Sequence, residues 1–135
     1  MDSIEIRVAT GGRAGIFDIT REVISFCAGK GEGLVSVFVP HATAGIAIFE
    51  TGAGSETDVL GAIDALLPAD PSRWRHEHGT PGHGRDHVLP AFVSPSLTVP
   101  VVGSQPALGT WQSIVLVDTN VDNPSRKVRL SFIAG

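Results

Sequence analysis

The amino-acid sequence predicts an α+β domain in which two helices lie against one side of a mostly antiparallel β-sheet. Short strand-like segments recur along the 135 residues, and two helical segments interrupt them in the first half. Only short turns separate the last three strand-like segments, which favours antiparallel neighbours. Because hydrophobic residues make up 42% of the chain, one domain over residues 1–135 can bury a sizeable core.

The strands are predicted from alternating apolar and polar side chains, or from short apolar runs that end at turn residues. Residues 4–8 alternate in this way. Residues 34–39 are apolar almost throughout and indicate a central strand that ends before Pro40. The other predicted strands cover residues 16–19, 46–50, 97–102, 110–118 and 128–132.

The helices are predicted over residues 21–28 and from Ser55 to the residue before Pro68. Thr20 suits the N-cap of the first helix, and a glycine follows its end. Ser55 and Asp58 resemble a capping box at the start of the second helix. The apolar face of that helix consists of Val59, Leu60, Ile63, Leu66 and Leu67.

The charge and composition limit the compartment and the partners. A net charge of -4 disfavours nucleic acid as a partner, because phosphate binding needs an excess of Lys and Arg. The single cysteine, Cys27, cannot form an internal disulfide and is expected to be a small core residue. No apolar run approaches the roughly 18 residues that span a bilayer. We therefore expect a soluble, cytoplasmic protein without a membrane partner.

The stretch over residues 74–87 contains four of the five histidines. Its Gly and Pro content predicts a loop rather than a helix or strand. A long polar loop between hydrophobic elements is usually functional or disordered, and the flanking elements favour function.

Imidazole is the commonest metal ligand among neutral side chains, which makes this stretch a candidate metal site. His76 and His78 are two residues apart, His83 and His87 are four apart, and His41 follows a predicted central strand. A ligand on a strand and others on a loop could form one site. The spacing matches no standard zinc motif, so a solvated loop with unliganded histidines remains an alternative.

Glu50 is the acidic candidate for this site. It ends the predicted strand over residues 46–50 and shares a face with Ile46 and Ile48. If that strand pairs with the preceding one, Glu50 could act as a ligand or a general base near His41. The alternative is an ordinary exposed acid at a strand end.

Three further residues have both a functional and a structural interpretation. Arg126 and Arg129 could bind a phosphate or carboxylate, or could balance Asp118 and Asp122 across a hairpin. Trp111 is expected to pack in the core from the strand over residues 110–118.

Four segments together resemble the YjbQ family of small proteins, some of which are described as having secondary thiamine-phosphate synthase activity. The most specific of them contains the Gly-Thr-Trp-Gln sequence at 109–112. The resemblance covers nearly the whole chain, and its segments are residues 41–45 with Glu50, 75–76, 87–89, and 96–101 leading to 108–114.

The resemblance implies a homotrimeric α+β domain with a histidine-lined polar pocket near a subunit boundary, able to bind a divalent metal such as zinc. His83 is outside the match, but lies close enough to His87 to be a fourth donor. The residues that match the family's recurrent positions are His41, His76 and His87, Glu50, Trp111, Gln112 and Arg126.

The chain departs from the family pattern at several positions. Phe49 replaces the usual Asn, Asp118 replaces a Glu, and a hairpin glycine is shifted to Gly103. Glu77 and His78 follow the second matching histidine, where the family has Asp or Asn. Because several of these changes fall near the expected pocket, they bear on the substrate more than on the fold.

Two functions follow as expectations. The first is a metal-assisted enzyme acting on a small phosphorylated molecule, with Glu50 and Arg126 as catalytic residues. Its thiamine-phosphate version would join a pyrimidine pyrophosphate to a thiazole phosphate with loss of pyrophosphate. The second is a non-catalytic trimer that binds a metal or a small anion. The cations available to an anion are Arg75, Arg85, Arg126 and Arg129.

Overall fold

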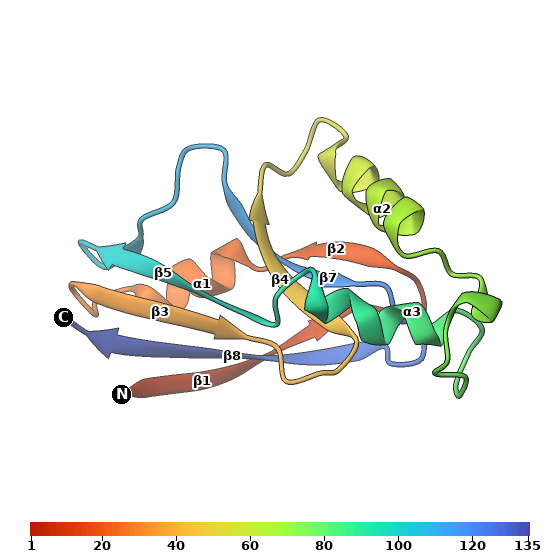
Figure 1. Cartoon of the computed structure of the whole chain (residues 1–135). Coiled ribbons are helices and arrows are strands. Elements are labelled where there is room, and N and C mark those ends of the chain that lie inside the picture. Colours follow the sequence, from red (N-terminus) through yellow and green to blue (C-terminus); the bar gives the residue numbers. More distant parts are fainter.

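A computed structural model describes all residues, 1–135, as two antiparallel sheets with helices around them (Figure 1). The larger sheet has the strand order β1-β8-β3-β5-β6. Its strands are β1 (Asp2–Ala9), β8 (Ser125–Ala134), β3 (Gly33–Phe38), β5 (Ser96–Val102) and β6 (Gln105–Pro106). The smaller sheet has the order β2-β7-β4, with strands β2 (Gly15–Asp18), β7 (Ser113–Asp118) and β4 (Ala44–Phe49).

The smaller sheet separates two hydrophobic cores because its strands alternate between them. On β7, Ile114 and Leu116 belong to the main core, together with β3 and β8 residues of the larger sheet. Val115 and Val117 on the same strand belong to a second core that contains Ile63 of a helix. The central strand of the smaller sheet is therefore buried on both faces.

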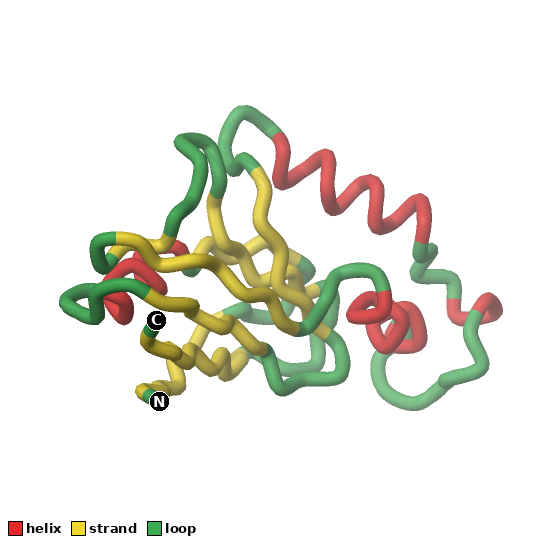
Figure 2. The backbone as a smooth tube through the Cα atoms, turned by 60° about the vertical axis from the view of Figure 1, so that its left-hand side comes forward, coloured by secondary structure: helices red, strands yellow, loops and turns green.

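Three α-helices complete the fold, in the order α1 (Thr20–Cys27), α2 (Ser55–Leu66) and α3 (His83–Val88). Two 3₁₀ turns, η1 (Pro71–Arg73) and η2 (Leu89–Ala91), flank α3. Helix α1 buries Val23, Phe26 and Cys27 in the main core. Helix α2 covers the face of the smaller sheet that holds the second core (Figure 2). Helix α3 lies at the end of the molecule opposite the two termini (Figure 1).

The α+β class and the mostly antiparallel pairing are confirmed, but the arrangement differs from one sheet with helices on a single side. Strand β7 leaves the larger sheet, so the last three long strands are not consecutive neighbours. Strands β3 and β4 also belong to different sheets. No helix is long and apolar enough to cross a bilayer.

The predicted helix caps are wrong. The Thr20 hydroxyl accepts a hydrogen bond from the Ile114 backbone N–H at 2.9 Å, which ties α1 to β7 instead of capping it. Gly54, with φ +94°, precedes α2, and no side chain caps that helix. Cys27 is fully buried as expected, and this burial raises the pKa of its thiol.

The strand predicted over residues 110–118 is shorter than expected. A turn occupies its first part, where the Gly109 backbone N–H donates to Gln112 Oε1 at 2.8 Å. Trp111 is 73% exposed, so its predicted role in core packing is wrong. Because the turn releases residues 109–112 from the sheet, strand alternation does not apply to them.

Candidate metal centre

Four histidines meet at the end of the molecule formed by α3 and the loop before it. The potential ligand atoms of His76, His78, His83 and His87 all lie within 4.8 Å of one another. We call these residues the four-histidine cluster. The structure therefore brings together three predicted ligands, His76, His83 and His87, and adds His78, which was not in the predicted set.

Helix α3 places two of the rings on one face. His83 and His87 are four residues apart, the spacing at which side chains stack along a helix. The loop predicted for this segment is wrong, because the chain becomes helical after Gly82, whose φ is +92°. The glycine-rich stretch thus contains the start of a helix rather than only a loop.

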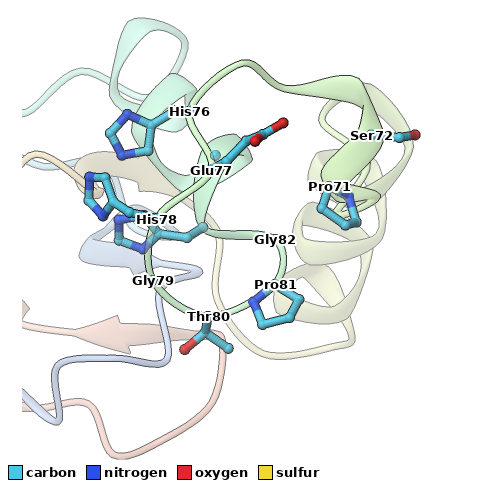
Figure 3. A pocket seen from close by; sticks show the side chains of 11 residues that line it. Pro71, Ser72, His76, Glu77, His78, Gly79, Thr80, Pro81 and Gly82 are labelled. Atoms are coloured by element: carbon cyan, nitrogen blue, oxygen red, sulfur yellow. The ribbon is translucent and has the colours of Figure 1, made fainter.

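The preceding loop supplies the other two rings. His76 and His78 are two residues apart, and Figure 3 shows the intervening Glu77 pointing to the opposite side from the His76 ring. Trp74 anchors this loop by donating from Nε1 to the Pro68 carbonyl at 2.8 Å. A Cβ at Gly84 would lie only 2.7 Å from the His76 carbonyl oxygen. The loop therefore packs directly on α3.

Two polar side chains lie beside one of the four rings. Asp122 Oδ2 lies 3.0 Å from His83 Nδ1, and Asn120 Nδ2 lies 3.1 Å from the same nitrogen. The other ring nitrogen of His83, Nε2, faces the cluster, where the His87 Nε2 lies 2.8 Å away. A carboxylate partner of this kind fixes the tautomer and raises the basicity of metal-ligating histidines.

The turn between β7 and β8 holds that carboxylate and helix α3 together. Asn120 Oδ1 accepts from the Asp122 backbone N–H at 3.0 Å, and its Nδ2 donates to Asp86 Oδ2 at 3.2 Å. Asp86 is buried on α3 and also accepts from the Thr119 hydroxyl at 2.6 Å. Arg85 donates to the same carboxylate at 3.1 Å. A buried polar network therefore supports the site, in addition to the packing of the loop.

The electrostatics favour neutral imidazoles. Partial burial lowers the pKa of His87, and the neighbouring histidines lower it further. The pKa of His76 is lowered by the same two causes. Neutral imidazole is the form that binds a metal, so the cluster suits a cation at neutral pH.

The nitrogen separations are compatible with one metal ion. Two nitrogens bonded to zinc at 2.0–2.1 Å in a tetrahedral arrangement lie about 3.3–3.4 Å apart. The Nε2 atoms of His83 and His87 are 2.8 Å apart, and the four ligand atoms span at most 4.8 Å. Side-chain rotations that shift these nitrogens by about 1–2 Å would therefore place all four around a single tetrahedral ion.

His41 is outside this cluster. Its Nε2 accepts a hydrogen bond from the Lys127 backbone N–H at 3.0 Å, which occupies that lone pair. Partial burial and then the nearby Arg126 lower its pKa. Within one chain, His41 therefore belongs to the surroundings of Arg126, and not to the group formed by the other predicted ligands.

Arg126 forms a buried ion pair. Its side chain is 1% exposed, and Nε donates to Asp118 Oδ2 at 2.6 Å. Its Nη2 donates to the Thr43 hydroxyl at 2.9 Å. The structural role that the sequence allowed for Arg126, an ion pair with Asp118, is therefore confirmed. Leaving either charge without its partner would cost about 3–5 kcal/mol.

Glu50 lies just beyond β4 and is exposed. The expected alternation is confirmed, since Ile46 and Ile48 face the main core whereas Ala47 and Phe49 face the second. The pairing of strands β3 and β4 that would bring Glu50 beside His41 is absent.

A polar pocket of about 370 Å³ adjoins the cluster (Figure 3). None of its lining residues is hydrophobic. No Lys or Arg lines it. Of the arginines proposed for anion binding, Arg85 and Arg126 are buried in ion pairs and Arg129 pairs with Glu5. Its eleven lining residues are Pro71, Ser72 and the continuous segment 76–84.

Sequence reasoning missed the supporting residues Asp122 and Asn120, and it left His78 out of the ligand set. The two-residue spacing from His76 was a signal for His78, because alternate side chains of an extended segment return to one side. Nothing in the sequence points to Asp122 as the partner of His83, since they are far apart along the chain.

The fold and the site define a two-sheet α+β domain with a supported cluster of imidazoles at one end. The family described as UPF0047 protein YjbQ-like matches residues 4–135. The chain therefore belongs to the YjbQ-like UPF0047 family, as its sequence resemblance implied.

Three relatives illustrate the similarity. A UPF0047 protein of Mycobacterium tuberculosis is 60% identical over 135 residues, which cover 100% of both chains. A hypothetical protein of Aeropyrum pernix K1 has a similar structure, with a TM-score of 0.88, 30% identity and coverage of 100% of both chains. A YbjQ-like protein of unknown function from Sulfolobus solfataricus P2 gives a TM-score of 0.91 at 26% identity, covering 99% of this chain and 97% of that one.

Proposed function

We propose that this protein binds a divalent metal ion, with zinc as the best fit, at the four-histidine cluster. The observation that carries the proposal is the convergence of four imidazoles whose ligand atoms lie within 4.8 Å. The lowered pKa values of His76 and His87 and the carboxylate beside His83 support it further. Imidazole donors suit zinc, copper, iron and nickel, and a four-nitrogen tetrahedral set is best suited to zinc.

The test compares two histidine variants. Purified wild-type protein, stripped and then dialysed against zinc, should retain about one ion per chain, as expected for a mononuclear site. His87→Ala should lose that ion, because His87 lies inside the cluster. His41→Ala is the matched control and should retain it, because the structure places His41 elsewhere. Equal zinc loss in both variants would contradict the single-chain site.

The ligand that we propose for the polar pocket is a small phosphorylated or otherwise anionic molecule. Its lining contains the side chains of Ser72, Thr80 and three histidines, and a bound cation would supply the positive charge that the lining lacks. Arg75 is exposed and precedes His76, so it is the nearest unburied cation along the chain. If the protein binds a metal and an anion without catalysing a reaction, the cluster, the pocket and Arg75 are sufficient.

The second candidate function is a transferase resembling the secondary thiamine-phosphate synthases. The opening of the cluster into a pocket favours it, because a reacting molecule could approach the metal there. In this version Glu50 is the general base and Arg126 supports an anionic group. The exposure of Glu50 and the buried pairing of Arg126 with Asp118 favour the non-catalytic version instead. Measurable pyrophosphate release that Glu50→Gln lowers by roughly 10²–10⁴-fold would decide for the enzyme.

We further propose that the chain assembles as a homotrimer in the cytoplasm. The reduced state of its single, buried cysteine suits that compartment. Exposed apolar side chains on the outer face of the larger sheet support assembly. Strand β7, in contrast, is buried and offers no exposed apolar edge for assembly.

A further inference from the structure

We infer that His78 is an exchangeable fourth donor of the cluster, and that a small oxyanion can take its place on the metal. The inference rests on the proposed metal site and specifies how that site receives a ligand. Four protein donors close the tetrahedral shell of zinc, whereas three leave a position for water or substrate. Whether the shell of this chain is closed or open depends on whether one of the four imidazoles can leave the metal.

Three of the imidazoles are held in place. Asp122 Oδ2 and Asn120 Nδ2 lie 3.0 Å and 3.1 Å from Nδ1 of His83 and hold its ring. His87 projects from the same face of α3, one turn further along. His76 is held through its backbone, because its carbonyl packs against Gly84 of that helix. The backbones of these three residues are therefore fixed by α3 and by the loop that packs on it.

His78 differs from His83 and His87, because it is exposed and no hydrogen bond to the protein orients its ring. The His76 ring shares this freedom, but the backbone of His76 packs on α3. Gly79 follows it with φ +83°, a conformation that glycine adopts without strain. Its ring lies 6.0 Å from that of His87, the largest centroid separation within the cluster. The His78 side chain can therefore leave the metal by its own rotation.

The space beside His78 suits an oxyanion. His78 lines the polar pocket of about 370 Å³ together with Gly79 and Thr80, and no lining residue is hydrophobic. A small molecule that enters this pocket reaches the metal from the side that His78 covers. Zinc binds oxygen as well as imidazole donors, so a phosphate oxygen can complete the shell. The ligand class is thus a small phosphate or carboxylate rather than an apolar molecule.

The test uses cobalt(II), whose visible absorption reports the geometry and identity of its ligands. Wild type, His78→Ala and His87→Ala are compared, with His78→Gln as a second variant at the exchangeable position. We expect one cobalt per chain in wild type and in both His78 variants, with affinity lowered by no more than roughly 10–100-fold, the scale of a lost supporting residue. His87→Ala should bind none. Inorganic phosphate should change the cobalt spectrum at lower concentration in His78→Ala than in wild type, because no imidazole must be displaced.

Two results would overturn the inference that an oxyanion can replace His78 on the metal. One is cobalt loss in folded His78→Ala or His78→Gln as complete as in His87→Ala, which would make His78 a permanent ligand. The other is a cobalt spectrum of His78→Ala that phosphate leaves unchanged. Failure of wild type itself to bind cobalt or zinc would overturn the proposed metal site, and the exchange with it. The wild-type measurement alone therefore separates the two failures.

Discussion

Asp122 is an exposed side chain that lies far from His83 in the sequence but beside its ring in the structure. It accepts from the Thr80 hydroxyl, which is the main cause of its lowered pKa, so the group stays ionised. Its Oδ2 lies 3.0 Å from His83 Nδ1, on the side of the ring opposite the Nε2 that faces the cluster. A carboxylate in this place supports the ring as a metal ligand, which makes Asp122 a positioning residue.

We expect Asp122→Asn to weaken zinc binding by roughly 10–100-fold, the range for loss of a ligand's supporting partner. The amide keeps the size of the side chain but not its charge. Asp58→Asn makes the same charge change on the exposed first turn of α2 and should leave zinc affinity unaltered. Competition with a chromophoric chelator measures both. Equal affinities for wild type and Asp122→Asn would show that the carboxylate has no such role.

At the scale of elements, the site depends on how closely the histidine loop packs on α3. Gly84 allows this packing, since a Cβ there would lie 2.6 Å from Trp74 Cβ and 2.7 Å from the His76 carbonyl oxygen. Both neighbours belong to the backbone or its first side-chain atom and cannot rotate away. Gly84 is therefore required inside helix α3, although glycine is unfavourable in helices.

Gly84→Ala should lower the free energy of unfolding by about 1–3 kcal/mol, as overpacking does, and should also weaken zinc binding. Gly61→Ala is the control within a helix, because nothing lies within 4 Å of a Cβ at that position in α2. It should stabilise the protein by about 0.5–1 kcal/mol. Urea denaturation followed by circular dichroism measures both changes. A Gly84→Ala protein as stable as wild type would show that the loop does not need this close approach.

At the scale of the whole molecule, the larger sheet leaves an apolar area uncovered. Its inner residues alternate with outer ones, and Leu34 lies opposite both Pro100 and Ile133 on neighbouring strands. Leu34 is 45% exposed, Ile133 55% and Val102 58%. Adjacent exposed apolar residues of this kind are typical of an interface between proteins.

We expect light scattering at micromolar concentration to give the mass of a trimer. Leu34→Glu should shift the mass toward the monomer, because a charge would be buried at the proposed interface. Thr57→Glu, at an exposed position of helix α2 away from the larger sheet, is the control and should stay trimeric. A monomeric wild type would reject the assembly, and a trimeric Leu34→Glu would place the interface elsewhere.

Much of the secondary structure is determined by local pattern alone. Apolar alternation located the main strands, and the apolar face and Pro68 located α2, because these signals depend only on neighbouring residues. The histidine-rich stretch also indicated the site, since imidazoles concentrated between apolar elements are a chemical signal in themselves. The helix α3 was missed because Gly82 and Gly84 weaken a helix locally, while packing against Trp74 favours it.

Only the tertiary structure decided which residues share the site. The sequence grouped His41 with His76 and His87, whereas the separation of β3 and β4 into different sheets places His41 beside Lys127 and Arg126. The sequence likewise determined the α+β class but not its division into two sheets. Strand pairing over long separations depends on which apolar faces bury each other, and no local pattern encodes that choice.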